Sequence, residues 1–239
     1  MPIEMLIQNE NFFHHFQPIY CLRTSNRLGY EVLLRSDVFS SPEDTFHEAR
    51  KVKRLYELDS RSIHKAVMTY LNVDTRNRDE LLFINVFPST ILNPSFLSFL
   101  KRMMDENPIN SQQIVLEISE TELIEDVQLL KRKIIAIRKL GFLIAIDDVG
   151  KGYSNFQAMI ELEPNYLKLD RYFSKDLHLS KRKQEIILFF SQYCKAQNIT
   201  LVLEGIESES EVSTAKALGI PNAQGYFLGR PNVLEEVSI

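Results

Sequence analysis

The chain has 239 residues, 44% of them hydrophobic, so it can bury one substantial core. Its formal net charge of -4 argues against a lysine-rich surface for nucleic acid, and DNA is therefore not an expected partner. Every apolar run is broken by charge before the roughly 18 residues of a membrane span, and the N-terminus lacks a secretory signal, so we expect a cytoplasmic chain with no membrane span.

Short apolar runs predict eight strands along the chain. They are rich in Ile, Leu and Val and often continuously apolar, which is typical of strands that are covered on both faces. Their ranges are 15–22, 28–35, 81–87, 113–119, 142–148, 166–170, 199–205 and 222–228.

Helical patterns lie between most of these strands. Apolar residues recur at three- and four-residue spacing over 42–72, and the patterns over 127–141 and 181–198 end on Gly141 and Asn198, residue types favoured just after a helix. Residues 23–28 leave no room for a helix, so the first two strands should form a hairpin. The alternation of strand and helix elsewhere predicts a largely parallel sheet.

This order predicts the α/β class, and eight strands in a chain of this length favour a TIM-type (β/α)8 barrel with an antiparallel strand near the N-terminus. An open, doubly wound sheet is the alternative, because periodicity alone does not exclude it. Two domains of about 120 residues would also fit the length, but no linker rich in Gly, Pro or Ser separates two halves. We expect a single domain over residues 1–239.

A polar residue stands at or near the C-terminal end of seven of these strands. Any one of them alone is more simply explained as the first solvated position of a loop. In a barrel, however, all these ends open on the same face, where active sites are assembled. The set comprises five carboxylates, two amides and one ammonium: Glu31, Asn85, Glu117, Asp147, Asp148, Lys168, Glu204 and Gln224.

Carboxylates that gather without cations repel one another, so such a cluster is costly unless it holds metal. Oxygen ligands without paired His or Cys suit Mg²⁺ or Mn²⁺ better than zinc. The strongest local signal is the segment IAIDDVGKGYSNF, in which two adjacent aspartates follow an apolar strand. One of these carboxylates could bridge two ions, and Gly150 and Gly152 allow a sharp turn over the site. A solvated Asp-Asp turn is the alternative.

The ordered motifs resemble those of the EAL family of cyclic di-GMP phosphodiesterases. YEVLLR is similar to the signature Glu-Ala-Leu-Leu-Arg with Val32 in place of Ala, and LEISETELI resembles the Glu-x-Thr-Glu stretch with Ser119 in place of Thr. FINVFPS, IDDVGKGYSNF, YLKLDRYF, LEGIES and AQGYFLGRP resemble the remaining motifs in order, from about Gln17 to Pro231. The resemblance implies the EAL variant of the barrel and two-metal hydrolysis of cyclic di-GMP to linear pGpG.

The resemblance also implies roles for individual residues. The two metal ions, Mg²⁺ or Mn²⁺, would be held by Glu31, Asn85, Glu117, Asp147, Asp148 and Glu204. Lys168 would hydrogen-bond the attacking water, with Glu204 and Glu31 as further catalytic residues. The substrate side would include Gln17 near a guanine, Arg35 at a phosphate, Gln224 and Pro231. Glu120 and Glu207 would brace the Asp-Asp loop and the rim of the site.

Two departures bear on activity. Where the family has Phe and Thr in its Asp-Asp-Phe-Gly-Thr-Gly loop, this chain has Val149 and Lys151. Family members with an altered loop are often weak or inactive, so the alternative function is an EAL module that binds cyclic di-GMP or a protein partner without hydrolysing the dinucleotide. An unrelated metal-dependent barrel hydrolase is a third alternative.

The expected partners follow from the same resemblance. The family places a self-complementary helical surface beside the loop at 149–153, so we expect a homodimer. A protein regulator is a further partner that the sequence leaves open.

Ca²⁺ should inhibit the hydrolysis, because it prefers longer and more numerous ligands than Mg²⁺ and is a poorer Lewis acid.

Overall fold

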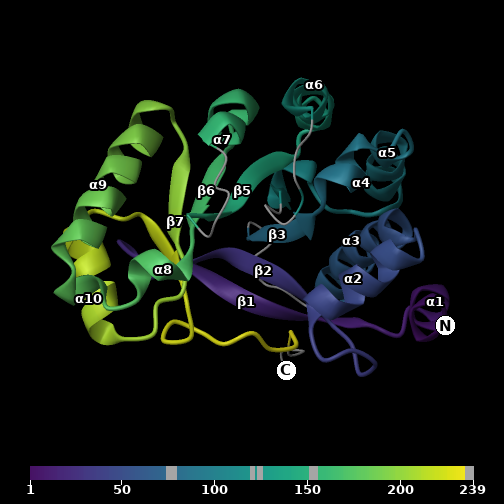
Figure 1. Ribbon diagram of the computed structural model, residues 1–239, viewed down its shortest axis with the longest axis horizontal. Coiled ribbons are helices and arrows are strands. Elements are labelled where there is room, and N and C mark those ends of the chain that lie inside the picture. The colour runs from purple at the N-terminus through teal and green to yellow at the C-terminus, as the bar shows by residue number, and fades with distance from the viewer. Residues whose placement is uncertain (74–79, 119–121, 123–125, 151–155, 235–239) are drawn as a thin grey trace.

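Eight strands close into a barrel in the computed structural model, which describes residues 1–73, 80–118, 122, 126–150 and 156–234. The strands follow one another around the barrel in chain order, and β8 pairs with β1. Figure 1 shows the strands of the barrel from β1 to β7 with the helices outside them. Their bounds are β1 Phe13–Cys21, β2 Arg27–Arg35, β3 Leu81–Val86, β4 Ile114–Ile118, β5 Leu143–Val149, β6 Tyr166–Leu169, β7 Thr200–Leu203 and β8 Asn222–Gln224. The TIM-type barrel is thereby confirmed, and the open sheet is excluded.

The first strand is the irregular member of the barrel. It runs antiparallel to both of its neighbours, β2 and β8, while every other neighbouring pair is parallel. A short turn joins β1 to β2, with Ser25 in the left-handed conformation (φ 59°). The hairpin and the antiparallel strand expected from residues 23–28 are confirmed.

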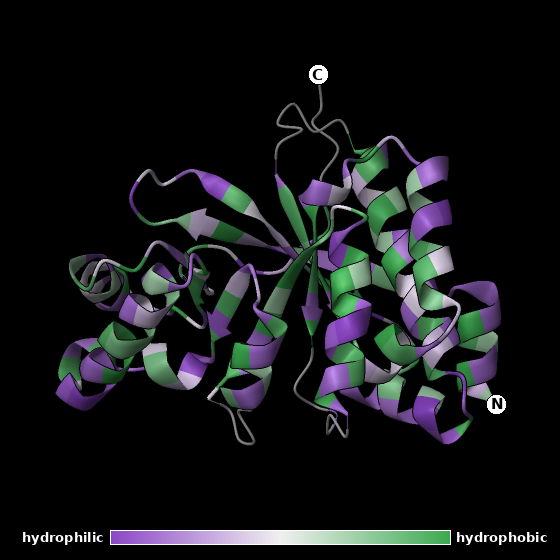
Figure 2. Ribbon diagram, turned by 90° about the horizontal axis from the view of Figure 1, so that it is seen from above, coloured by the Kyte–Doolittle hydropathy of each residue, from purple (hydrophilic) through white to green (hydrophobic). Residues whose placement is uncertain are grey.

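Helices surround the barrel on its outer side, as Figure 1 shows. Their bounds are α1 Pro2–Asn9, α2 Pro42–Lys51, α3 Leu55–Asn72, α4 Pro88–Leu92, α5 Phe96–Glu106, α6 Val127–Arg138, α7 Phe156–Leu162, α8 Arg171–Ser174, α9 Lys181–Ala196 and α10 Glu209–Ala217, with single 3-10 turns at Ser111–Gln113 and Leu177–Leu179. In Figure 2 the central strands are mostly green, that is hydrophobic, and hydrophobic and hydrophilic residues alternate along the helices. Over the described ranges, no helix has the length and hydropathy to cross a membrane.

Two apolar layers hold the barrel together. The larger lies between strands and helices and includes Leu116, Ile144 and Leu167, which are completely buried. The smaller fills the barrel itself and consists of Ile19, Phe83, Val115, Ala145 and Val202. Side chains alternate between the two layers along each strand, because successive residues of a strand point to opposite faces.

The structure differs from the sequence-based expectation in three places. The helical pattern over 42–72 is split into α2 and α3, because Lys53 takes a left-handed conformation (φ 58°) that a continuous helix does not allow. The last strand is shorter than expected and ends at Gln224. Helix α1 was not expected, and it packs Ile3, Leu6 and Ile7 against Leu58 of α3.

Candidate active site

The polar residues at the strand ends point into the barrel mouth because they continue its inward-facing stripe. Five of them follow an inward apolar residue of their own strand by two positions, so the alternation of the strand places them on the same face. The pairs are Phe83 and Asn85, Val115 and Glu117, Ala145 and Asp147, Tyr166 and Lys168, and Val202 and Glu204. The apolar filling of the barrel is thus the floor of a polar site.

Lys168 occupies the centre of this site. Its side chain is fully buried, and its Nζ atom lies 2.7 Å from Glu204, 2.9 Å from Glu117, 3.0 Å from Asp147 and 3.4 Å from Glu31. Four strands other than its own therefore direct carboxylates at one ammonium group. The sequence-predicted residues Glu31, Glu117, Asp147 and Glu204 are brought together with it.

Burial and charge act on these groups in opposite directions. Burial lowers the pKa of the Lys168 ammonium, but the surrounding carboxylates outweigh burial and hold that pKa well above its usual value. Burial raises the pKa of Glu117 well above its usual range, and Lys168 offsets only part of this effect. The pKa of Glu204 is raised for the same reason. One lysine does not compensate this many acids, so the site favours additional cations.

A bulge in β5 brings two adjacent aspartates to the same mouth. Ile146 pairs with Leu167 and Val149 pairs with Leu169, so two residues of β5, Asp147 and Asp148, stand opposite one residue of β6, Lys168. Asp148 within this bulge has φ 55°, a left-handed conformation that is uncommon for residues other than glycine. In a regular strand Asp147 and Asp148 would point to opposite faces, and the bulge removes this restriction.

Two groups of three carboxylates have oxygen atoms within 4.8 Å of one another, a spacing that could hold a metal ion. The groups are Glu31, Glu117 and Asp147, and Asp147, Asp148 and Glu204. Asp147 belongs to both, which is the arrangement that a carboxylate bridging two ions requires. The buried Oε2 atom of Glu117 has no hydrogen-bond partner in the described part of the chain, so it fits a ligand to a cation. The donor set is all oxygen and suits Mg²⁺ or Mn²⁺.

Amide side chains hold Glu31 from two sides. Gln224 Nε2 donates to Glu31 Oε2 at 2.5 Å and to Gln17 Oε1 at 2.9 Å, while Asn85 Nδ2 lies 3.5 Å from Glu31 Oε1. Gln17 in turn donates to the carbonyl of Gly229 at 3.1 Å. The antiparallel β1 therefore contributes Gln17 to the network that orients Glu31.

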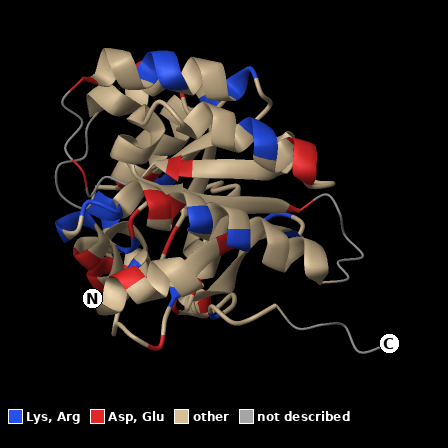
Figure 3. Ribbon diagram, turned by 90° about the vertical axis from the view of Figure 1, so that its right-hand side faces the viewer, with Lys and Arg blue, Asp and Glu red and all other residues tan. Residues whose placement is uncertain are grey.

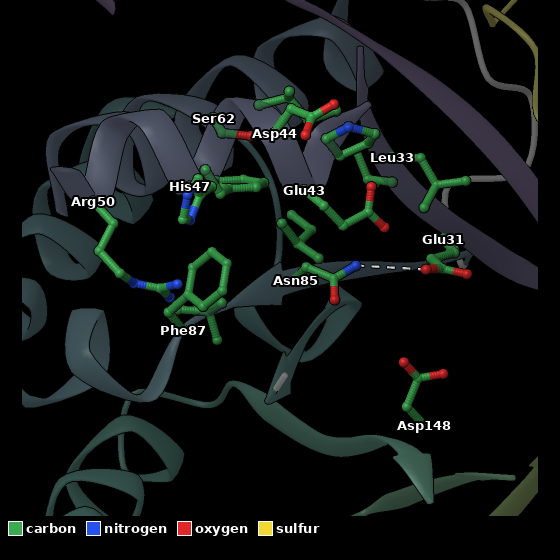
Figure 4. Close-up of a pocket in the computed structure, with 16 residues that line it drawn as sticks. Glu31, Leu33, Glu43, Asp44, His47, Arg50, Ser62, Asn85, Phe87 and Asp148 are labelled. Atoms are coloured by element: carbon green, nitrogen blue, oxygen red, sulfur yellow. Dashed lines mark hydrogen bonds between the residues drawn. The ribbon is translucent and has the colours of Figure 1, made fainter. Parts of the chain in front are cut away.

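A hollow of about 530 Å³ opens on one side of the acids. Figure 4 shows Glu31, Asn85 and Asp148 at one end, and His47, Arg50 and Phe87 at the other. Its walls come from the ends of β2 and β3 and from helix α2, which supplies Glu43, Asp44, Phe46, His47 and Arg50. This hollow combines apolar walls with a few polar groups, as ligand sites do.

A second hollow of about 360 Å³ opens on the other side. It is lined by Gln17, Glu204, Glu207, Gln224 and Tyr226 among others. Both hollows include Glu31, Leu33 and Asp148 in their lining, so they meet at the acids. A ligand whose centre lies on the acids could extend to both sides.

The remaining sequence-predicted residues lie farther out or outside the described ranges. Arg35 is on the same strand face as Glu31, and its Nη1 donates to the carbonyl of Leu34 at 2.8 Å. Pro231 is half-buried next to Asn232, which forms a bridge with Phe16. Glu207 is exposed at the second hollow.

The altered loop is described only in part. Val149 is buried in β5, where it pairs with Leu169. Glu120 and Lys151 lie outside the described residues.

Sequence reasoning missed the far end of the first hollow. Phe46, His47 and Arg50 lie in an ordinary amphipathic helix, and Phe87 follows an apolar strand, so none of them carries a local signal. The one usable signal was the position of Phe87, which is only two residues beyond Asn85. Basic and acidic residues are interspersed on the side of the molecule that Figure 3 shows.

The amino-acid sequence of the chain is similar to those of known proteins. The family model described as EAL domain matches residues 3–231. The cyclic di-GMP phosphodiesterase PdeB of Shewanella oneidensis is 28% identical over 238 residues, which are 97% of this chain and 28% of that protein. The cyclic di-GMP phosphodiesterase PA2567 of Pseudomonas aeruginosa is 30% identical over 240 residues, 98% of this chain and 41% of that protein. The chain thus spans less than half the length of these two relatives.

Solved structures with the same fold contain cyclic di-GMP. The calcium and cyclic di-GMP complex of BlrP1 from Klebsiella pneumoniae matches with a TM-score of 0.84 and 27% identity, over 97% of this chain and 57% of that chain. A manganese complex of the same protein matches with a TM-score of 0.83 and 28% identity, over 92% and 56%. A standalone EAL protein from Vibrio cholerae O395 bound to cyclic di-GMP matches with a TM-score of 0.82 and 28% identity, over 92% of each chain.

Proposed function

The chain belongs to the EAL domain family, and on that premise we propose that it is a metal-dependent phosphodiesterase that hydrolyses cyclic di-GMP to linear pGpG. The observation that carries the proposal is the pair of carboxylate groups that share Asp147 and open on two hollows. The proposal treats residues 1–239 as one domain. It also keeps the cytoplasmic location expected from the sequence, because the substrate is an intracellular second messenger.

The residues that would hold two Mg²⁺ or Mn²⁺ ions are Glu31, Asn85, Glu117, Asp147, Asp148 and Glu204. When bound, such ions polarise a phosphodiester and lower the pKa of water. Glu31 enters this set already oriented by the amide of Gln224, so little of its freedom is lost on binding. Asp147 and Asp148 reach the same mouth through the β5 bulge.

Lys168 and Glu204 are the proposed groups that act on the attacking water. Their charged atoms lie 2.7 Å apart at the centre of the site, within reach of one water molecule held between the acids. Lys168 carries a proton at neutral pH, because the surrounding acids raise its pKa, so it donates a hydrogen bond to the water oxygen. Glu204 then accepts the proton that the water loses. As the water oxygen bonds to phosphorus, the bond from phosphorus to one ribose 3′ oxygen breaks, and that oxygen takes up a proton and becomes the free hydroxyl of linear pGpG.

The arrangement of the two hollows supports cyclic di-GMP as the substrate. This molecule has two guanosine halves on a ring with two phosphodiesters, and the hollows leave the acids in two directions. A phosphodiester at Glu31 and Asp148 would place one half in each hollow. Gln17 and Gln224 line the second hollow, and Arg35 and Pro231 stay proposed contacts of the substrate.

We also propose that the chain forms a homodimer through α7, α8 and α9. Phe156, Ile160, Tyr172 and Phe189 expose about half or more of their surface there, at 54%, 60%, 62% and 57%. The ring of Phe190 contacts those of Phe156 and Phe189, so these two exposed rings continue one apolar cluster. A patch of this kind is a common interface between copies of a chain. Light scattering after size exclusion should give twice the mass of one chain.

The test of the proposed function is product formation. The purified protein is incubated with cyclic di-GMP and Mn²⁺ or Mg²⁺, and pGpG is sought by chromatography, with a chelated sample and a Glu117→Gln variant as controls. We expect pGpG from the wild type with either ion, less with Ca²⁺, and none in the two controls. Tight binding without product would instead establish the receptor function. Undiminished turnover after chelation would contradict the metal-dependent mechanism.

A further inference from the structure

Arg50 lies in the first hollow at the end away from the acids, where the proposed chemistry does not use it. Figure 4 shows its guanidinium beside the ring of Phe87, while Glu31 and Asp148 lie at the opposite end. The guanidinium carbon is 5.3 Å from the centre of that ring, a cation–π distance. The phosphodiester must lie at the acids, so Arg50 is placed to contact another part of the ligand.

Glu122 fixes the position of Arg50. Its Oε1 accepts a hydrogen bond from Arg50 Nη2 at 2.7 Å and from the hydroxyl of Ser89 at 2.9 Å, and its Oε2 accepts from the backbone N–H of Ser89 at 2.9 Å. Only 15% of the Glu122 side chain is exposed, against 44% of Arg50. The carboxylate therefore anchors the guanidinium to the first turn of α4, and the cation is held rather than free in solvent.

The held guanidinium keeps donors for a ligand. Arg50 makes one hydrogen bond through Nη2, and its Nη1 and Nε atoms make none to the described part of the chain. An arginine presents its N–H groups in a fixed, planar fork and accepts nothing. A partner at this end must therefore offer acceptor atoms in one plane.

We propose that Arg50, positioned by Glu122, selects guanine over adenine in this hollow. The inference rests on the proposed cyclic dinucleotide substrate. Guanine presents two acceptors, O6 and N7, which is the edge that arginine recognises in a bidentate manner. Adenine presents N7 beside an N6 amino donor, so it would place a donor against the donors of Arg50.

The other walls of the hollow agree with guanine. Glu43 and Asp44 line the hollow and are acceptors only, while guanine carries the donors N1–H and N2–H₂ on the edge opposite to N7. The rings of Phe46 and Phe87 pack edge to face, with their centres 4.9 Å apart, and give the base an apolar wall. Among the residues that line this hollow, Arg50 is the one Lys or Arg, so the selection against adenine falls to it.

The test compares the binding of two cyclic dinucleotides. Dissociation constants for cyclic di-GMP and cyclic di-AMP are measured by calorimetry in Ca²⁺, for the wild type, Arg50→Ala, Arg50→Lys and Glu122→Ala. Arg23→Ala, in the exposed hairpin turn between β1 and β2, is the matched control. Circular dichroism and melting temperature confirm that each variant is folded. Measuring binding keeps the result independent of turnover.

We expect the wild type to prefer cyclic di-GMP. Arg50→Ala should lower that preference about tenfold or more, the discrimination typical of one bidentate contact. Arg50→Lys keeps the positive charge but lacks the planar pair of N–H donors, so it should not restore the preference for cyclic di-GMP. Glu122→Ala should give a smaller loss, and Arg23→Ala none.

A purely structural role of Arg50 would weaken both ligands equally. A preference unchanged within twofold in Arg50→Ala, or fully restored by Arg50→Lys, would therefore overturn the inference while leaving the proposed function intact. A wild type that binds neither dinucleotide would overturn both. Binding of cyclic di-GMP without hydrolysis would contradict only the proposed reaction. The preference for cyclic di-GMP over cyclic di-AMP would still decide the role of Arg50.

Discussion

Asp59 is a buried acid beneath the wall of the first hollow, and its replacement gives a quantitative prediction. It lies on α3, is 1% exposed, and its Oδ2 accepts the backbone N–H of Phe87 at 3.1 Å. Burial raises its pKa from 3.8 to about 7; the hydrogen bond from the Phe87 N–H opposes this rise, and the charge of Glu122 adds to it. Asp59→Asn keeps an oxygen for the Phe87 amide but cannot ionise.

The sign of the effect follows from proton linkage. The folded state holds the Asp59 proton up to about pH 7, whereas the unfolded chain releases it near pH 4, so the unfolded state binds fewer protons between these values. The free energy of unfolding of the wild type therefore falls by about 1.4 kcal/mol for each pH unit in this window. Over the whole window the loss is about 4 kcal/mol, and Asp59→Asn avoids it.

Urea unfolding of the metal-free wild type and Asp59→Asn at pH 5, 6, 7 and 8 measures this loss. The variant should gain stability relative to the wild type as pH rises, with most of the gain complete by pH 7. Asp59→Ala is the control for the contact itself: it leaves the Phe87 N–H without its acceptor and should be less stable than Asp59→Asn at every pH. A difference between Asp59→Asn and wild type that is the same at pH 5 and pH 8 would refute the reasoning.

Three further predictions concern the site and its loop. Lys168→Ala should lower the rate of hydrolysis on the order of 10²-fold or more, because it removes a group that positions the water; a wild-type rate would withdraw its catalytic role. Glu31→Ala should instead raise the Mn²⁺ concentration needed for half-maximal activity, and an unchanged metal dependence would remove Glu31 from the ligand set. Gly150→Ala should lower the free energy of unfolding by about 1–3 kcal/mol. Its Cβ would lie 2.2 Å from the Phe173 ring at a residue with φ 103°, so a melting temperature equal to that of the wild type would contradict this.

The sequence predicted the barrel and the inner acids because both follow from strand periodicity. Once Glu117 and Lys168 are placed at the ends of parallel strands, the closure of the barrel brings them together without further information. The position of Asp148 could not be predicted from strand periodicity, because its side chain reaches the barrel mouth only through the bulge between Ile146 and Val149. A bulge leaves little trace in the spacing of apolar residues.

The ligand hollow could not be predicted in the same way. Arg50, Phe87 and Glu122 come from three separate connections, and their contact depends on how α2 packs against the residues that follow β3 and β4. The split between α2 and α3 at Lys53 also helps to set that packing, and no glycine or proline marks it in the sequence. Such features depend on tertiary contacts rather than on local pattern.

Hydrolysis in ¹⁸O-labelled water tests the central claim most directly. The wild type with Mn²⁺ is incubated with cyclic di-GMP in labelled water, and the product is examined by mass spectrometry. If water between the acids attacks phosphorus, pGpG forms with one ¹⁸O atom in its terminal phosphate, and Lys168→Ala forms far less of it. Unchanged cyclic di-GMP after prolonged incubation with protein that binds it, or pGpG without the label, would contradict the account.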